Sequence, residues 1–306
     1  MLLRIGTRAS KLALTQTKWV IARIFAHNPD IRIELVKIKT SGDKITNMPL
    51  SAIGGKGLFV KEIEEALIRK DIDIAVHSLK DVPAELPDSL IIGIIPERED
   101  PRDVMIAKDN TFFDDLPRNS CIGTSSLRRA AQLLHYRPDL KILPIRGNLD
   151  TRIKKLHLDD IQAIIVAAAG LKRMGFDDII TQSFSYEFML PAIGQGALGL
   201  ELRKDDQKTG DILAFLDHYA TRVAVKAERS FLMELKAGCH LPVAGFAKFE
   251  NDSLCLYGLV ADLDGKTIIR DTVVGRPENA RDLGSTLAQK LLDAGAREIL
   301  NSISGK

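Results

Sequence analysis

Cysteine is scarce in this chain, and its three copies stand apart at Cys121, Cys239 and Cys255. No two of them form a CxxC pair, and an odd number leaves one thiol over. The sequence therefore indicates neither a zinc knuckle nor a disulfide framework. We expect no metal site, and the roles of Cys121 and Cys255 stay open.

A surplus of charge of one sign is also lacking. The 43 lysines and arginines almost balance the 41 aspartates and glutamates, which leaves a formal net charge of +2. Such a small charge does not attract nucleic acid or a membrane surface in bulk. We therefore expect neither partner, and any basic site must be a local concentration of arginine.

Long apolar runs are missing as well. Residues 1–6 become polar and patterned at once and lack a signal-peptide core, and no apolar run reaches the roughly 20 residues that span a bilayer. With 306 residues, 45% of them hydrophobic and 27% charged, the composition is that of an ordinary globular protein of two or three domains. We expect a soluble, cytoplasmic protein.

Short apolar strands alternate with amphipathic helices through the first two thirds of the chain. This pattern is typical of α/β layers around parallel or mixed sheets. The predicted strands are residues 2–6, 31–38, 72–76, 90–95, 104–107, 121–123, 141–145 and 163–167. A charged break with two prolines, residues 96–102, interrupts the series, and we interpret it as a crossing between domains.

The last third has a different pattern. Residues 211–235 predict one long helix, and residues 243–250, 254–262 and 267–274 predict strands. The Asp-Gly step in residues 262–265 is typical of a hairpin between the last two strands. A helix over 278–294 follows, so this end is predicted to be a small antiparallel sheet with helices.

A faint internal echo connects the two strand-helix series. Residues 5–7 and 122–124 both read Ile-Gly-Thr, and each leads through serine and arginine into a predicted helix. We interpret the echo as two α/β domains of similar build that face each other across a cleft. Ligands of such sheets lie beyond the carboxyl ends of the strands, where both echoes fall.

Cys239 lies in the run Lys-Ala-Gly-Cys-His-Leu-Pro of residues 236–242. A thiol between a glycine and a proline-stopped stretch is typical of a loop, and loops carry function disproportionately. The alternative is a small buried hydrophobe, which is what an unpaired cysteine most often is.

A helix start is predicted at residues 124–129, Thr-Ser-Ser-Leu-Arg-Arg. Leu127 begins an i, i+3, i+4, i+7 apolar stripe, so Thr124 or Ser125 is the expected N-cap, with Ser126 beside them. Arg128 and Arg129 then lie in the first turn, where the helix dipole disfavours cations. An anion bound at the helix start would explain them, and a solvated surface is the alternative.

Other arginines also lie where strands end and helices begin. Each is most often a surface charge when taken singly, but several guanidinium groups at such junctions favour a ligand with several carboxylates. These junction arginines are Arg8 (with Ser10 close by), Arg128, Arg129, Arg146, Arg152 and Arg173.

Asp81 follows the predicted buried strand 72–76, beside Lys80 and before a proline. A structural capping role and a catalytic role are both open for this carboxylate. His77 has no metal-ligand or nucleophile partner nearby, so we interpret it as structural.

Two glycine-rich segments need separate interpretations. Residues 41–58 are long and rich in glycine, which favours a loop that closes over a site, but their Gly-Gly-Lys-Gly lacks the spacing of a nucleotide P-loop. Residues 194–199 match GxGxxG, yet they lead into a predicted strand at 198–202 instead of a helix. We therefore reject a dinucleotide site there.

These motifs together resemble the porphobilinogen deaminase (hydroxymethylbilane synthase) family. The resemblance runs essentially from end to end, and its motifs are highly specific as an ordered set. They fall at residues 4–8, 54–59, 73–83, 97–103, 123–129, 146–148, 169–173 and 191–196.

The resemblance implies three domains. The first two, residues 1–97 with 197–216 and residues 98–196, would be similar periplasmic-binding-protein type II α/β domains with mixed five-stranded sheets. The third, residues 217–306, would be an α+β domain with a three-stranded antiparallel sheet. The family also implies a cytoplasmic monomer.

The activity that the resemblance implies is the head-to-tail joining of four porphobilinogen molecules. Four ammonia molecules are released, and water frees hydroxymethylbilane. A dipyrromethane cofactor would be held as a thioether on Cys239, and Asp81 would be the catalytic carboxylate. Loss of ammonia leaves an electron-deficient pyrrole cation, which a nearby carboxylate stabilises.

The resemblance also implies roles for residues around these two. The lid loop would be bordered by Lys56 and Phe59, and the cofactor would contact Ser78, Lys80, Thr124, Ser126, Arg128, Arg129 and Arg146. Substrate and product would contact Arg8, Ser10, Gln16, Arg146, Arg152, Arg173 and Gln195. The chain departs from many relatives at His240-Leu241 and at Ser41. Neither departure touches the proposed chemistry, and the second leaves the lid contacts open.

Two other functions compete with this one. A non-enzymatic, two-lobed anion-binding protein would explain the arginines but not a thiol in an added third domain. A thiol-nucleophile hydrolase would need a base, and His240, which is adjacent to Cys239, rarely gains the necessary geometry from that position.

Overall fold

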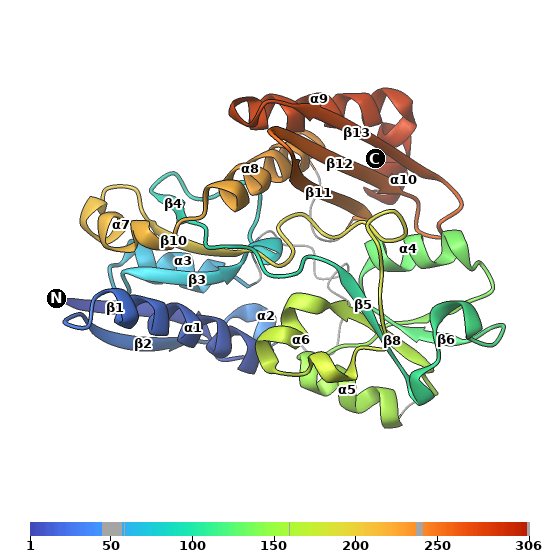
Figure 1. Cartoon of the computed structure of the whole chain (residues 1–306), viewed down its shortest axis with the longest axis horizontal. Helices are drawn as coiled ribbons and strands as arrows, with labels where there is room; N and C mark the ends of the chain where they lie inside the picture. The colour runs from blue at the N-terminus through green and yellow to red at the C-terminus, as the bar shows by residue number, and fades with distance from the viewer. Residues whose placement is uncertain (45–56, 58, 159, 237–240, 305–306) are drawn as a thin grey trace.

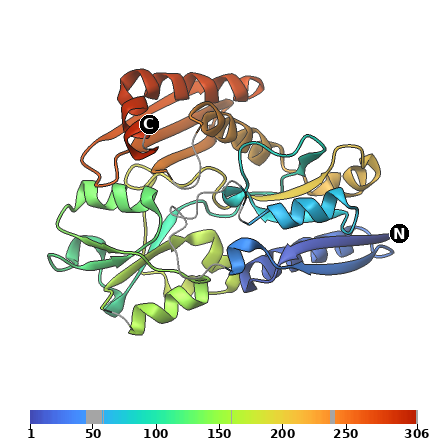
Figure 2. The same cartoon turned by 180° about the vertical axis from the view of Figure 1, so that it is seen from behind.

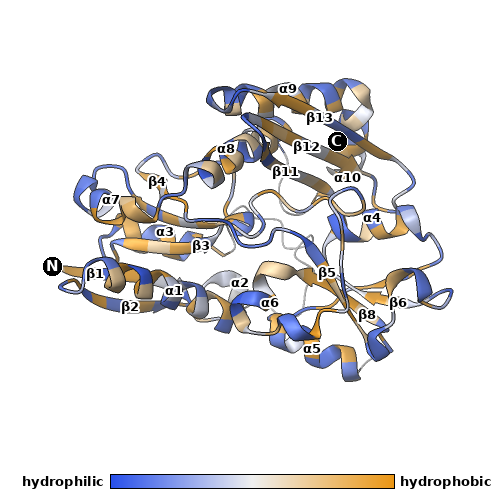
Figure 3. Ribbon diagram, viewed as in Figure 1, coloured by the Kyte–Doolittle hydropathy of each residue, from blue (hydrophilic) through white to orange (hydrophobic). Residues whose placement is uncertain are grey.

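The computed structural model describes residues 1–44, 57, 59–158, 160–236 and 241–304. An N-terminal lobe and a middle lobe lie side by side, and a C-terminal part lies over both (Figures 1 and 2). Strands are largely apolar, whereas polar residues concentrate on the outer helices and loops (Figure 3).

The N-terminal lobe contains a mixed five-stranded sheet in the order β2-β1-β3-β10-β4. β1 pairs in parallel with β2 and β3, and β10 pairs antiparallel with β3 and β4. Helices α1 (Lys11–His27) and α7 (Gln207–Leu213) pack on one face, and α3 (Lys61–Ile68) packs on the other. The strands are β1 (Leu2–Arg8), β2 (Arg32–Ile38), β3 (Ile74–Ser78), β4 (Leu90–Ile94) and β10 (Leu198–Arg203).

The middle lobe repeats this arrangement in the order β7-β6-β8-β5-β9. β6 pairs in parallel with β7 and β8, and β5 pairs antiparallel with β8 and β9. Helix α4 (Leu127–Tyr136) covers one face, and α5 (Leu149–Leu158) and α6 (Ala168–Met174) cover the other. The strands are β5 (Asp103–Ala107), β6 (Cys121–Gly123), β7 (Lys141–Leu143), β8 (Ala163–Ala167) and β9 (Gln182–Ser183).

The chain crosses between the lobes twice, directly before β5 and directly before β10. The strand that follows each crossing, β5 or β10, runs antiparallel to both of its neighbours in its sheet. The two sheets therefore share one topology, which confirms the predicted pair of similar α/β domains.

The C-terminal part contains an antiparallel sheet in the order β11-β12-β13. Its strands are β11 (Val243–Glu250), β12 (Ser253–Ala261) and β13 (Ile268–Gly275), and its main helices are α8 (Tyr219–Glu234) and α9 (Ala280–Leu291). Phe231 of α8, Leu287 of α9 and Leu256 of β12 are fully buried in their shared core. The predicted three-stranded antiparallel sheet is confirmed, as is the hairpin at 262–265, where Asp262 and Thr267 exchange hydrogen bonds.

Shorter helical segments complete the chain. α2 (Ser41–Lys44) is followed by residues that lie outside the description. The 3₁₀ turns are η2 (Leu79–Asp81), η3 (Lys108–Asn110), η4 (Phe113–Asp115), η5 (Asp177–Ile179), η6 (Ala214–Leu216) and η7 (Pro277–Asn279).

The single helix predicted over 211–235 is wrong. α7 ends at Leu213, and α8 begins at Tyr219. Asp217 breaks the helix because its carboxylate accepts the backbone N–H of Ile95 at 2.8 Å and pairs with Arg222. His218 then adopts an extended backbone and caps α8.

The helix predicted over 278–294 is too short, and strand β9 was not predicted. Beyond α9, a π-helical segment at Leu292–Ala296 contains Gly295 at φ +106°, and α10 (Arg297–Ser304) follows. A glycine adopts that positive φ without steric cost, so the chain turns there and continues as helix.

A buried ion pair joins the three parts of the molecule. The guanidinium of Arg98, on the first crossing, donates to both carboxylate oxygens of Glu228 of α8 at 2.5 and 3.2 Å. The same carboxylate accepts the N–H of Gly194, on the second crossing, and of Ala247 in β11. Glu228 has no exposed surface, so its charge is balanced entirely within this joint.

Candidate active site

Asp81 lies at the end of a buried strand. β3 leads into the single 3₁₀ turn η2, and Leu79, 2% exposed, fixes that turn by donating its N–H to the carbonyl of Ala197 at 3.0 Å. Val82, also 2% exposed, closes the turn from the other side. Lys80 and Asp81 keep part of their surface between these two anchors. The side chain of Ser78, the N-cap residue of η2, makes no capping hydrogen bond.

The arginine-bearing helix begins one or two residues later than predicted. Ser126, not Thr124 or Ser125, is the N-cap of α4, because its side chain accepts the N–H of Arg129. Thr124 accepts the N–H of Ser126 at 3.2 Å, and Ser125 donates its hydroxyl to the carbonyl of Ile145 at 2.6 Å. Thr124 and Ser125 therefore fix the backbone that leads into the helix.

Asp103 supplies a counter-charge that the sequence interpretation missed. Its carboxylate, fully buried at the start of β5, accepts from Arg128 at 2.6 Å and from Arg129 at 2.7 and 3.0 Å. Burial alone would raise the pKa of Asp103, but the two guanidinium charges outweigh it and hold that pKa well below its usual value. The first-turn arginines are thus paired inside the protein.

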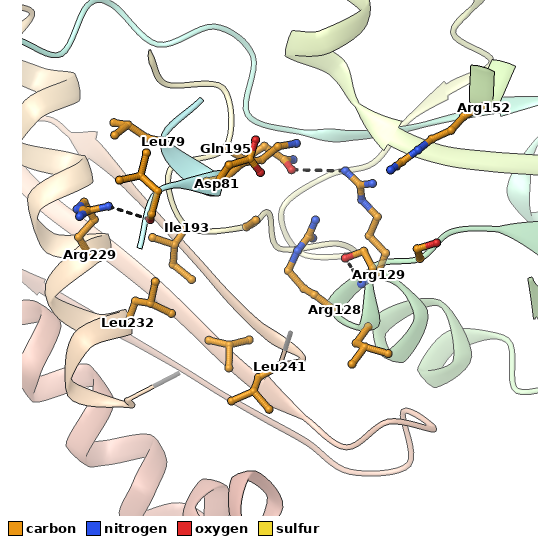
Figure 4. A pocket seen from close by; sticks show the side chains of 17 residues that line it. Leu79, Asp81, Arg128, Arg129, Arg152, Ile193, Gln195, Arg229, Leu232 and Leu241 are labelled. Atoms are coloured by element: carbon orange, nitrogen blue, oxygen red, sulfur yellow. Dashed lines mark hydrogen bonds between the residues drawn. The ribbon is translucent and has the colours of Figure 1, made fainter. Parts of the chain in front are cut away.

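A cavity of about 200 Å³ lies where the three parts meet. Arg128, Arg129 and Arg152 enter it from one side and Arg229 from the other, with Asp81 and Gln195 between them (Figure 4). It is lined by Leu79, Lys80, Asp81, Val82, Ser125, Ser126, Leu127, Arg128, Arg129, Arg152, Ala192, Ile193, Gln195, Arg229, Leu232, Leu241 and Val243.

The cavity crowds positive charge into a buried space. Desolvation lowers the pKa of Lys80 to about 8, although Asp81 opposes the shift. Desolvation and the neighbouring charge of Arg129 lower the pKa of Arg152 to about 10. An anionic ligand would stabilise the charged forms of cations that burial destabilises in this way.

One wall of the cavity is apolar and comes mostly from the C-terminal part. Leu232 projects from α8, and Leu241 and Val243 follow it along the chain, with Ile193 of the second crossing beside them (Figure 4). The sequence interpretation gave none of these residues a role in a site. A flat organic ring suits such a wall better than a small inorganic anion does.

Seven of the predicted site residues line this cavity. They are Lys80, Asp81, Ser126, Arg128, Arg129, Arg152 and Gln195. The amide of Gln195 already donates to the carbonyl of Pro101 at 2.7 Å and to Asp103 at 2.9 Å. Gln195 therefore links the second crossing to the first and to the Asp103 pair.

Other predicted residues lie outside the cavity lining. Ser10 caps α1 by accepting the N–H of Ala13, and Gln16 donates to the hydroxyl of Ser78 at 2.9 Å. The guanidinium of Arg8 lies 4.2 Å from the centre of the Phe59 ring. The remaining residues of this group are Thr124, Arg146 and Arg173, the last of which donates to the carbonyl of Gly196 at 2.7 Å.

Lys56, Cys239 and His240 lie outside the described part of the chain, as does most of the predicted closing loop at 41–58. The two other cysteines are described. Cys121 is partly exposed in β6, and Cys255 is buried in β12, where its thiol donates to Glu250 at 3.4 Å.

Two further searches cover only the described ranges. No helix in them is long and apolar enough to cross a membrane. Within the same ranges, no three His, Cys, Asp or Glu side chains form a group that could hold a metal ion.

The lining of the cavity combines several cations, one carboxylate and an apolar wall. Bidentate guanidinium groups recognise carboxylates, and an apolar wall accepts rings. A lone carboxylate in such a place can hold a pyrrole-like N–H or stabilise a developing cation. The cavity therefore suits chemistry on an aromatic molecule that carries several acid groups.

Family comparisons give a consistent result along the whole chain. The family model described as "Porphobilinogen deaminase, dipyromethane cofactor binding domain" matches residues 3–211, and "Porphobilinogen deaminase, C-terminal domain" matches residues 222–293. Similar curated proteins are named porphobilinogen deaminase. The one from Trichlorobacter lovleyi is 52% identical over 98% of this chain and 96% of its own length, and the one from Bacillus pumilus is 50% identical over 98% and 97%.

Solved structures with distant similarity include bacterial binding proteins. The methionine binding protein MetQ has a TM-score of 0.46 and 13% identity and covers 70% of this chain and 89% of its own. The aliphatic sulphonate binding protein SsuA from Escherichia coli has a TM-score of 0.41 and 13% identity over 77% and 70%.

Proposed function

The chain belongs to the porphobilinogen deaminase family, and we propose that its central cavity is the active site of that enzyme. The protein is a transferase of tetrapyrrole and haem biosynthesis. It joins four porphobilinogen molecules head to tail on a dipyrromethane primer, releases four ammonia molecules and hydrolyses off hydroxymethylbilane. The observation that carries the assignment of the site is that Asp81 shares one cavity with the α4 arginines.

The cavity residues fit a dipyrromethane. That group carries acetate and propionate arms on two pyrrole rings, so it needs several cations, an apolar surface and an acceptor for ring N–H groups. Arg128, Arg129 and Lys80 would hold its acid arms, while Ile193 and Leu241 would contact its rings. When bound, the group supplies the pyrrole carbon to which substrate units are joined.

Cys239 is the proposed attachment point, through a thioether. Leu241, two residues further along the chain, lines the cavity. Two residues of extended chain span at most about 7 Å, so an anchor at Cys239 would start close to that wall. The thiol-hydrolase alternative has no such support.

Asp81 is the proposed catalytic residue. Its carboxylate would accept the pyrrole N–H of the reacting unit and stabilise the cation that forms when ammonia leaves. For two charges about 4 Å apart at an effective dielectric of 20, the attraction is about 4 kcal/mol, or roughly a thousandfold in rate. A neutral hydrogen bond of about 1 kcal/mol would contribute far less, so the charge is essential.

Arg152 would bind the acid arms of the units that are added. Arg152 reaches the cavity from α5 and is held there because its Nε–H donates to the carbonyl of Gly147 at 2.9 Å. We further propose that the outer group contacts substrate and the growing chain as it leaves the cavity. This outer group comprises Arg8, Ser10, Gln16, Arg146 and Arg173, and Gln195 joins it from the cavity side. Ser78, Thr124 and Arg146 would contact the cofactor.

We also propose the division of the chain that the resemblance implies. Residues 1–97 with 197–216, residues 98–196 and residues 217–306 would be the three domains, and the enzyme would work as a cytoplasmic monomer. The competing function, a non-enzymatic anion-binding protein, is not favoured, because the family that matches nearly the whole chain is an enzyme family.

Intact-mass spectrometry tests the proposed anchor directly. Active protein should be heavier than its polypeptide by two linked pyrrole units, and Cys239→Ser should lose that increment. Cys121→Ser is the matched control, since this partly exposed thiol has no proposed role, and it should keep the adduct. Bare polypeptide in active protein, or an adduct that survives Cys239→Ser, would refute the anchor.

A carboxylate-to-amide change tests the proposed catalytic role. Asp81→Asn should keep the fold and the adduct but turn over porphobilinogen roughly a thousandfold more slowly. Asp88→Asn removes an exposed carboxylate from the same segment and should behave like the wild type. Near-normal turnover by Asp81→Asn would remove Asp81 from the chemistry.

A further inference from the structure

Arg229 clasps the segment that directly follows Asp81. From helix α8 its guanidinium donates to three consecutive backbone carbonyls, those of Val82 at 3.3 Å, Pro83 at 2.7 Å and Ala84 at 3.1 Å. The same side chain lines the cavity (Figure 4). Arg229 thus touches both the cavity and the support of the Asp81 turn.

The clasped segment has little internal hydrogen bonding of its own. It runs as Val-Pro-Ala over residues 82–84 without regular structure, and Pro83 has no N–H to donate. Apolar contacts add to the clasp. Val82 packs in one cluster with Val225 of α8, and Ala84 packs against the core of the C-terminal part. The Asp81 turn is therefore docked on α8.

We propose that Arg229 is a positioning residue that holds the Asp81 carboxylate in its working place through the backbone of residues 82–84. The inference rests on the proposed catalytic role of Asp81. It also assigns a purpose to α8, which ends at Glu234, five residues before Cys239. The turn that carries the proposed carboxylate would then be supported by α8.

Arginine suits this role better than lysine. A planar guanidinium presents several N–H groups in a fixed fork and can serve three carbonyls at once, whereas an ammonium is a compact charge on a flexible stem. A displacement of about 1 Å at a reacting group costs on the order of a hundredfold in rate. Removal of the clasp should therefore slow the chemical step without weakening substrate binding.

Steady-state kinetics of Arg229→Met and Arg229→Lys test the proposal. We expect Arg229→Met to lower kcat about a hundredfold and to change KM less than threefold, with the Cys239 adduct still present by intact mass. Arg229→Lys should recover about tenfold of that loss and guards against a methionine variant that does not fold.

Arg270→Met is the matched control. Arg270 of β13 also donates to backbone carbonyls of a neighbouring segment, those of Glu187 at 2.7 Å and Tyr186 at 2.8 Å, but it lies outside the cavity lining. This variant should lose a similar amount of thermal stability and keep the wild-type kcat. If it loses kcat as Arg229→Met does, the effect is general loosening and the proposal fails.

A double-mutant cycle separates positioning from direct substrate contact. In an Asp81→Glu background, whose carboxylate is already displaced, Arg229→Met should lower kcat less than threefold further. An undiminished hundredfold loss there, a rise in KM at constant kcat, or wild-type kcat in Arg229→Met would each overturn the proposal. If the wild-type protein does not consume porphobilinogen, the proposed function fails together with this proposal. If the wild-type activity is normal, a failed test concerns the role of Arg229 alone.

Discussion

Asp103→Asn is the change that most directly tests the charge balance at the cavity. The carboxylate has no exposed surface and pairs with Arg128 and Arg129, whose side chains are 5% and 7% exposed. Asparagine has nearly the same shape and keeps one acceptor. Its amide group, however, removes the negative charge and presents a donor to one of the two guanidinium groups. Two buried cations would then face each other without a carboxylate between them.

The expected cost is a large share of the stability of the protein. Breaking a buried ion pair by removing one partner costs about 3–5 kcal/mol, and whole proteins are stable by only about 5–15 kcal/mol. One kcal/mol lowers Tm by roughly 2–4 °C in a protein of this order of size, so the loss should be about 6 °C or more. Because the pKa of Asp103 is lowered, the wild type holds its full advantage at neutral pH and loses it as pH falls below about 4.

Urea unfolding and thermal melting at pH 7 and at pH 3 measure this difference. The variant and the wild type that are compared should both carry Cys239→Ser, so that neither holds an adduct. Asp139→Asn is the matched control, because Asp139 forms the same kind of pair with Arg137 where both side chains are partly exposed, and its Tm should stay close to that of the wild type. A Tm for Asp103→Asn within 2 °C of the wild type at pH 7 would refute the inferred charge balance.

Three further predictions follow from other contacts. Glu228→Gln should destabilise the protein by about 3–5 kcal/mol in urea, because Arg98 would lose its buried counter-charge; an unchanged midpoint would contradict this. Folding lowers the pKa of Lys80 to about 8. Between pH 8 and 10, the unfolded chain therefore keeps a proton on Lys80 that the folded protein has lost, and stability rises with pH. Adduct-free protein should therefore gain Tm over that range, and Lys80→Met should gain less. Gly265→Ala should cost about 1–3 kcal/mol, because Gly265 has φ +71° and an added Cβ would lie 2.2 Å from the carbonyl oxygen of Ala131 in α4; melting curves that superimpose would exclude this contact.

Strands were predictable where one local pattern decides the structure. The apolar runs at 104–107 and 163–167 lie in the central strands β5 and β8, since few other structures bury a short, continuous apolar run. The Asp-Gly turn at 262–265 likewise depends on four residues. Asp81 ends the 3₁₀ turn that follows β3, and its local sequence left a capping role and a catalytic role open.

Features that depend on distant residues were not predictable. The break between α7 and α8 comes from the contact of Asp217 with the N–H of Ile95, 122 residues away, and no helical periodicity records it. Arg229 looks like any arginine on an amphipathic helix until α8 is docked on residues 82–84. A faint signal existed for Asp103 alone, which is a charged residue at the head of a fully buried strand.

Asp103 also changes the reason for expecting an anion at α4. The sequence interpretation took two first-turn arginines as evidence for a bound anion, but one internal carboxylate already pairs with both. The case for an anionic ligand rests instead on the cavity as a whole. Lys80, Arg128, Arg129 and Arg152 line the cavity with Asp81, and Asp103 lies behind the two α4 arginines. A primer with several acid arms would complement this group of cations better than a single carboxylate would. The number of cations, more than the position of any one of them, selects a ligand with many carboxylates.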